Sequence, residues 1–212
     1  MEDTIVINDL INRYSIRKGE LFKSIVNFIL RSNSRVISSK SITDYVNNNY
    51  EACSINTIIK YLGYLEEAYI IEKIKPYSTK TKSELKYYYK MYNADVAFNS
   101  IRCMDNRFDL IHNLENIVYN KLIYRGYNLN VYYINNTEID FIANKDGKKY
   151  YIQVEYSVED DKAYNRELRP FSKIDNMDKK ILITNDEIDY STSTVTHIKL
   201  NDFLNIDSLD EI

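Results

Sequence analysis

Three polar residues in the second half of the chain have the types and spacing of an oxygen-rich site. Asp140 lies in a predicted strand at 138–143, and Gln153 and Glu155 lie in the next predicted strand, at 150–157. Residues two apart in a strand share a face, so pairing of the two strands can bring these side chains together. Carboxylate and amide oxygens are the ligands that Mg²⁺ and Mn²⁺ prefer. The pattern predicts a metal site with Asp140 and Glu155 as ligands. The alternative is a row of exposed polar side chains on half-buried strands.

Glu115 is the fourth candidate, and it lies on a predicted helix at 110–125. Its neighbours at helical spacing are Ile111, Val118 and Leu122, so the carboxylate lies beside the apolar stripe. A buried carboxylate is costly unless it meets a cation, a metal or a hydrogen-bond donor. Glu115 therefore either joins the acidic site or reaches the surface at the edge of the helix.

The elements around these residues read as helix, three strands, helix, strand. A strand at 129–134 precedes the two named above, and Asp146–Gly147 marks a hairpin turn between them. Alternation predicts Ile139, Phe141 and Ala143 on one strand face, opposite Asp140. A polar helix at 160–175 broken at Pro170, strands at 180–184 and 197–200, and a short helix at 201–205 complete the pattern.

The first half of the chain reads as three helices followed by a β-hairpin, which is the order of a winged helix-turn-helix. The predicted helices are 20–31, 40–49 after a Ser38 or Ser39 cap, and one after a Ser54 cap. The predicted strands are 69–75 and 85–92. The residues expected to face inward on the second and third helices are Ile42, Tyr45, Val46, Ile55, Ile58, Ile59, Leu62, Leu65 and Tyr69.

The third helix and the hairpin carry the candidate DNA contacts. The helix would present Asn56, Thr57, Lys60, Tyr61 and Tyr64 to the major groove. The hairpin is rich in lysine, which suits contact with phosphates, and its candidates are Lys75, Lys80 and Lys82. A protein-binding or purely structural role for the winged helix is the alternative, because the third helix ends in two glutamates.

Composition and charge narrow the function classes. The chain has 212 residues, 44% of them hydrophobic and 28% charged, a globular balance. Residues 1–94 carry 14 Lys and Arg against 10 Asp and Glu, whereas residues 95–212 carry 14 against 21. Two modules with different partners are therefore expected, with nucleic acid at the basic one. Two cysteines and two histidines exclude zinc-finger spacing, and a reducing cytoplasmic location is expected.

The order helix-Glu, strand-Asp, strand with two polar residues resembles the PD-(D/E)XK nuclease superfamily. The whole chain resembles the C-terminal region of a family of prokaryotic AAA-type ATP-binding proteins, in which an ATPase module precedes a winged helix and a nuclease-like domain of unknown function. The stretches that carry this resemblance are TIVINDLINRYSIR, YLGYLEEAYII, LENIVYNKLIYRGY, EIDFIA, YYIQVEYS, ELRPFSKI and HIKLNDFL.

The resemblance implies that Asp140, Gln153, Glu155 and Glu115 occupy the catalytic positions of the superfamily. The sequence departs from the motif, because Gln153 replaces an acid and Glu155 stands where a water-activating lysine is usual. A carboxylate cannot donate a proton to stabilise negative charge as an ammonium does. Lys149 or Lys162 would have to supply that charge. No GxxxxGK[ST] motif occurs, so the chain offers no P-loop for ATP.

The sequence therefore predicts an α+β protein with a linker at 1–17, a winged helix at 18–94 and a restriction-endonuclease-like domain with a central mixed sheet at 95–212. The resemblance implies that the linker follows an ATPase module absent from this chain, because the chain is truncated or the gene is split. The expected function is a DNA-binding accessory region of an AAA-type ATPase with a degenerate nuclease site. An active Mg²⁺- or Mn²⁺-dependent endonuclease and a protein-interaction module that regulates the ATPase are the alternatives. No membrane partner is expected.

Overall fold

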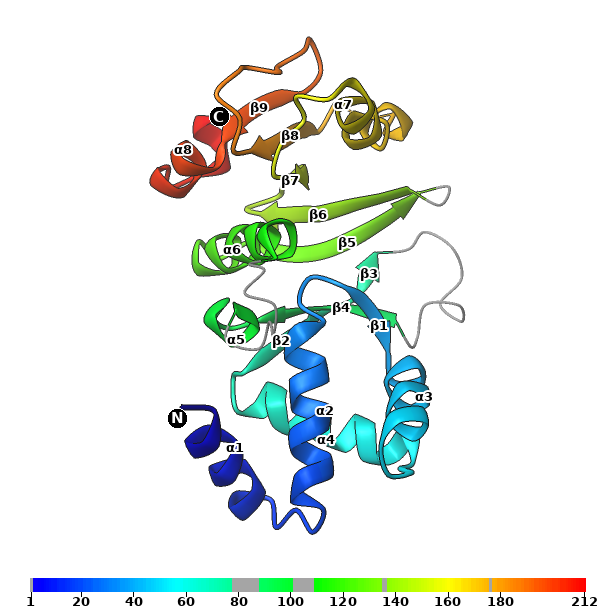
Figure 1. The fold of residues 1–212 in the computed structure, drawn as a ribbon. Coiled ribbons are helices and arrows are strands. Elements are labelled where there is room, and N and C mark those ends of the chain that lie inside the picture. Colours follow the sequence, from blue (N-terminus) through cyan, green and yellow to red (C-terminus); the bar gives the residue numbers. More distant parts are fainter. Residues whose placement is uncertain (1, 78–87, 101–108, 135–136, 176) are drawn as a thin grey trace. The chain divides into compact units, whose positions relative to one another are not determined.

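The computed structural model describes residues 2–77, 88–100, 109–134, 137–175 and 177–212. It is a mixed α+β structure in which the chain divides into two compact units (Figure 1). The first unit comprises Met1–Lys73 and Lys86–Phe108, and the second comprises Ile74–Leu85 and Asp109–Ile212. Neither unit is therefore continuous in sequence, because Ile74–Leu85 of the second unit interrupts the first.

The first unit is a helical body with a three-stranded sheet. Its elements are α1 (Glu2–Arg13), α2 (Gly19–Arg31), β1 (Val36–Ser38), α3 (Ser39–Asn49), α4 (Ile55–Glu67), β2 (Ile71–Ile74), β4 (Tyr88–Asn93) and α5 (Ala97–Ser100). The strand order is β1-β4-β2, and β1 pairs antiparallel with β4. The last strand of the unit therefore lies in the middle of its sheet.

Serine caps fix the starts of α3 and α4, as the sequence predicts. The Ser38 hydroxyl accepts a hydrogen bond from the backbone amide of Ser41, and the Ser41 hydroxyl accepts one from the Ser38 amide. The Ser54 hydroxyl accepts a bond from the Thr57 amide at 3.2 Å. Each cap satisfies an amide that the first turn of a helix leaves unpaired.

Fewer residues lie in the apolar core of the first unit than the sequence predicts. On α4 the buried residues are Ile58, Tyr61, Leu62 and Leu65, a single stripe at helical spacing. The expectation that Tyr61 faces DNA is therefore wrong, because its ring packs edge-on against the buried Phe22 at 4.9 Å. The inward placement of four further residues is also wrong, because all four are exposed: Tyr45, Ile55, Ile59 and Tyr69. Tyr69 lies beyond the end of α4, in the turn that follows the helix.

The second unit is built on a six-stranded mixed sheet. Its elements are β3 (Pro76–Tyr77), α6 (Leu110–Tyr124), β5 (Asn128–Ile134), β6 (Thr137–Lys145), β7 (Lys148–Val154), α7 (Asp161–Leu168), η1 (Phe171–Lys173), β8 (Lys179–Thr184), β9 (Thr196–Lys199), α8 (Leu200–Asn205) and η2 (Leu209–Glu211). The strand order is β3-β5-β6-β7-β8-β9. Strand β6 pairs antiparallel with both β5 and β7. Strand β8 pairs parallel with both β7 and β9.

Helices cover both faces of this sheet. Helix α6 lies against β5 and β7, and Tyr119 on α6 faces Phe141 on β6 with 6.2 Å between the ring centroids. On the other face, Ile142 and Tyr151 pack in one buried cluster with Phe171 of η1. The sheet is therefore enclosed around β6 and β7, which places Asp140, Gln153 and Glu155 in a largely dry environment.

A register shift in β6 overturns the predicted alternation. The pairing of β5 with β6 shifts between Asn130 and Tyr132, opposite Ile142 and Ile139. Ile139 consequently joins the cluster of Ile142 and not the face of Phe141. One extra residue in a strand reverses the direction of the side chains beyond it, and simple alternation cannot foresee that. The expectation that Ile111 lies in the core is also wrong, because this residue is exposed on α6.

Across the ranges that the structure describes, no helix is long and apolar enough to cross a membrane.

Candidate functional site

Asp140 lies at the point where the pairing of β6 with β7 ends. The last backbone pair on that side joins Phe141 to Ile152. Asp140, the next residue of β6, contacts β7 through its side chain instead. Its Oδ2 atom accepts a hydrogen bond from the backbone amide of Val154 at 2.9 Å. Asp140 is buried, so this bond satisfies an amide that water does not reach.

Glu155 follows the last residue of β7 and is held by two partners. Its Oε1 atom accepts a bond from the backbone amide of Tyr156 at 2.9 Å. Its Oε2 atom lies 2.8 Å from Nη2 of Arg166, a residue of α7. The side chain of Glu155 is 10% exposed, so this ion pair is largely desolvated at the carboxylate end.

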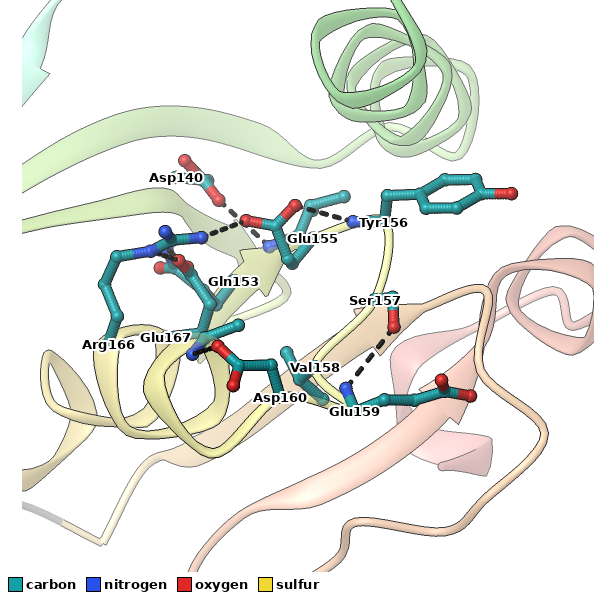
Figure 2. A network of polar contacts seen from close by, with 12 residues as sticks. Asp140, Gln153, Glu155, Tyr156, Ser157, Val158, Glu159, Asp160, Arg166 and Glu167 are labelled. Atoms are coloured by element: carbon teal, nitrogen blue, oxygen red, sulfur yellow. Dashed lines mark hydrogen bonds and ion pairs between the residues drawn. The ribbon is translucent and has the colours of Figure 1, made fainter.

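Arg166 bridges a second buried carboxylate, Glu167. Nε of Arg166 lies 2.6 Å from Oε1 of Glu167, and the side chain of Glu167 is 9% exposed. The hydrogen bond and charge of Glu167, and then the charge of Glu155, raise the pKa of Arg166 above its ordinary value. Figure 2 shows the guanidinium between these two carboxylates, with α7 supplying both the cation and one of the acids.

Gln153 completes the cluster and is only half satisfied. Its Nε2 atom donates to Oε2 of Glu167 at 2.7 Å. Its Oε1 atom is buried and has no hydrogen-bond partner among the described residues. An amide oxygen without a donor in a buried position is unfavourable, and it marks the place where the cluster can accept a further positive group.

Three of the four predicted site residues are thus brought to the end of β7, and they are joined there by Arg166 and Glu167. Asp140, Gln153 and Glu155 are all buried. Glu115 is also buried, on α6, so the alternative in which it reaches the surface is wrong. No group of three or more His, Cys, Asp or Glu residues in the described part of the chain is placed to hold a metal ion.

Sequence reasoning missed Arg166 and Glu167, and it looked for the cation in the wrong place. Lys149 pairs across the hairpin with Asn144, and Lys162 is exposed on α7. A usable signal was present, because Glu167 follows the half-buried Tyr164 by three residues and therefore borders the apolar side of α7. That this side of α7 faces β7 is a result of tertiary packing, which cannot be seen in the sequence of α7.

The candidate DNA contacts are largely on the surface, and Lys75 among them belongs to the second unit. Asn56, Lys60 and Lys75 are exposed, and Thr57 is half-buried because its hydroxyl meets that of the Ser54 cap at 3.0 Å. Nζ of Lys60 lies 5.7 Å from the ring centroid of Tyr64 on the same helix. The remaining two candidates, Lys80 and Lys82, lie outside the described residues.

Comparison with known proteins finds similarity without an assigned activity. Residues 2–103 match a family described as "Domain of unknown function (DUF8612)", and residues 112–203 match one described as "Domain of unknown function (DUF4143)". An uncharacterized protein of Haemophilus influenzae is 30% identical over 182 residues, which is 86% of this chain and 45% of that protein. An uncharacterized protein of Methanocaldococcus jannaschii is 32% identical over 196 residues, which is 87% of this chain and 43% of that protein.

This chain spans less than half the length of either relative. No solved structure matches it. The chain is therefore similar to two families of unknown function, one over each half, and to two longer uncharacterized proteins.

Proposed function

We propose that the first unit is a winged helix that contacts duplex DNA, and that the second is a nuclease-like unit without useful catalytic activity. The observation that carries the first part is the strand order β1-β4-β2, with α3 and α4 inserted between β1 and β2. In a winged helix the second of these two helices is the one presented to the major groove. The exposed Asn56 and Lys60 on α4 support that role.

Phosphate contact is proposed for the lysines around the hairpin. Lys75 is exposed, and Lys80 and Lys82 follow it in the sequence, within the segment Ile74–Leu85 that belongs to the second unit. Lys73 is excluded from this set because it is paired with Glu66 at 2.5 Å and lies 5.1 Å from the ring centroid of Tyr89. Lysine contacts of this kind position a protein on DNA without reading its sequence.

We propose that the nuclease-like site is degenerate because its carboxylates already have hydrogen-bond or ion-pair partners within the protein. Asp140 uses an oxygen to bind the Val154 amide, and Glu155 uses one to bind Arg166. Carboxylates bind divalent cations through one oxygen or through two, but the guanidinium of Arg166, 2.8 Å from Oε2 of Glu155, would repel a cation there, so the residues present do not fit Mg²⁺ or Mn²⁺ in this arrangement. The guanidinium of Arg166, shared between two carboxylates, is also a poor replacement for a free ammonium beside an attacking water.

An ATPase module is the proposed partner. The chain covers 45% and 43% of its two relatives, so each relative has room for a further domain of comparable size. Together with the resemblance of the motifs to AAA-type proteins, this supports a DNA-binding accessory role beside an ATPase in the full-length protein or in a partner chain.

A DNA titration tests the proposal. Lys60→Glu in the first unit and Lys75→Glu in the second, made as separate variants, should each weaken binding to a duplex and reduce the slope of log affinity against log salt, by about one unit for each phosphate that is no longer neutralised. Lys162→Glu is the matched control, because it makes the same charge change at an exposed position on α7. An equal weakening in the control would contradict DNA contact through these lysines. Unchanged affinity in Lys60→Glu would contradict contact through α4, and unchanged affinity in Lys75→Glu would contradict contact through the segment that follows β2.

A protein-interaction role is the second candidate, favoured by the acidic balance of residues 95–212, which carry 14 Lys and Arg against 21 Asp and Glu. A DNA groove is ordinarily basic, so such a surface suits a basic partner better. A parent chain that binds no duplex even at low salt would promote this candidate. Cleavage of plasmid DNA with Mg²⁺ or Mn²⁺ that an Asp140→Asn variant loses would instead promote the nuclease.

A further inference from the structure

We propose that Arg166 is a built-in cation that takes the place of a metal ion at the end of β7, and that a divalent cation binds there only when the guanidinium is removed. The inference concerns the second unit alone. It does not depend on DNA binding by the first unit.

The charges of the cluster explain why a cation is needed. The Glu155 and Glu167 side chains are 10% and 9% exposed, and one guanidinium lies within 2.8 Å of both. Two buried carboxylates without a counter-ion would repel each other and lack the solvation that water gives them. Arg166 removes that cost, so it supplies the positive charge that a metal ion supplies in other acidic sites.

The oxygens that remain without Arg166 are those of a hard-cation site. Glu155 Oε2 and Glu167 Oε1 would lose their partner, and Gln153 Oε1 has none among the described residues. Two carboxylate oxygens and one amide oxygen are the ligand types that Mg²⁺, Mn²⁺ and Ca²⁺ accept. The unpaired amide oxygen shows that the present arrangement satisfies the carboxylates but leaves part of the cluster unmatched.

Arg166 is placed so that it can leave without dismantling the fold. Its side chain is 66% exposed, whereas those of its two partners are buried. The side chain of Arg166 reaches the cluster from the solvent. Its rotation outward would therefore break two ion pairs without opening an apolar core. The cation is therefore the removable member of the cluster, and the acids are the fixed ones.

Titration of the full chain with MnCl₂, followed by calorimetry and by thermal melting, tests the proposal. The parent should show no saturable binding and no rise of Tm with Mn²⁺. Arg166→Gln should lower the Tm without metal, and should gain both saturable binding and a Tm that rises with Mn²⁺ concentration. The gain in affinity over the parent should be roughly tenfold or more, since a competing charge has been removed.

Two further variants keep the test decisive. Arg169→Gln removes the same side chain from an exposed position at the end of α7 and should behave as the parent does. Arg166→Gln with Glu155→Gln should lose the gained binding. If Arg166→Gln does not fold without metal, recovery of its far-UV circular dichroism on addition of Mn²⁺, and not of K⁺ at equal ionic strength, is the supporting result.

The proposal is overturned if the parent binds Mn²⁺ as tightly as Arg166→Gln, or if neither binding nor refolding is gained by that variant. A gain of the same size in Arg169→Gln would also overturn it. None of these results bears on Lys60 and Lys75, so failure here is distinguishable from failure of the DNA-binding proposal.

Discussion

The Asp140 carboxylate accepts a hydrogen bond from the backbone amide of Val154, with 2.9 Å between Oδ2 and N. A side chain here replaces the carbonyl that a neighbouring strand would offer, at the place where the β6–β7 ladder ends. The residue that the sequence marks as a metal ligand therefore has a structural task as well. Any experiment that removes this side chain tests both roles at once.

Asp140→Ala should destabilise the protein by about 1–3 kcal/mol, because it leaves the buried Val154 amide without an acceptor. Asp140→Asn keeps an oxygen in reach and should cost distinctly less. Urea unfolding of both variants beside the parent measures the difference. Equal destabilisation in the two variants would show that charge, and not the hydrogen bond, is what Asp140 contributes.

Leu65→Ala should lower the free energy of unfolding by roughly 2–5 kcal/mol, because Leu65 is fully buried in the core of the first unit. Ile59→Ala on the same helix removes a comparable side chain from an exposed position and should have little effect. Thermal melting of both variants checks the placement of the α4 stripe. A larger destabilisation in Ile59→Ala would mean that the buried side of α4 is assigned to the wrong residues.

Stability should fall as the pH drops below about 6.5, the ordinary pKa of histidine, through His197. Burial lowers the pKa of His197, against a smaller opposing effect of Asp189. The ring is held neutral, since Nδ1 accepts from the Tyr190 amide and Nε2 lies 2.9 Å from the Thr184 hydroxyl.

The sign follows from the two pKa values of His197. The unfolded chain takes up the proton first as the pH falls, so the stabilising contribution is complete above about 6.5 and declines until the folded-state pKa is reached. Unfolding free energies of the parent and of His197→Gln, measured between neutral and mildly acidic pH, should converge toward the acidic end. A constant gap between the two would refute the assignment.

Tyr69→Gly should stabilise the protein slightly. Tyr69 follows α4 with a φ of 54° and is 81% exposed, so its side chain gains little from packing while its backbone is in the left-handed region. Relief of about 1–2 kcal/mol of steric cost outweighs the roughly 0.4–1 kcal/mol of extra entropy in the unfolded chain. A small rise in Tm is expected, and a fall would mean that the tyrosine ring makes a stabilising contact.

Local features of the fold could be predicted from the sequence because their causes are local. The Ser38 and Ser54 caps and the Asp146–Gly147 turn depend on residues within a few positions of one another. The common face of Gln153 and Glu155 also follows from strand geometry, and both side chains contact α7 as that geometry requires.

The rest depends on partners distant in sequence. The shift that reverses Ile139 arises from the pairing of β6 with β5, and periodicity within β6 carries no trace of it. Arg166 was missed because its role is set by the side of β7 on which α7 lies. A search for lysines close to Glu155 in sequence could not find a guanidinium that a helix brings back from eleven residues away.

The route of the chain constrains the order in which the protein can mature during synthesis. The middle strand of the first sheet, β4, is made after β1 and β2, and Ile74–Leu85 of the second unit is made before it. Until residue 93 has left the ribosome, β1 and β2 both lack their shared neighbour and expose unpaired edges. Domain-by-domain folding from the N-terminus is common in multidomain chains. Here the first sheet cannot be completed until Ile74–Leu85 of the second unit has been translated. Strand β3, which lies in that segment, has no partner in the second sheet until β5 has been made.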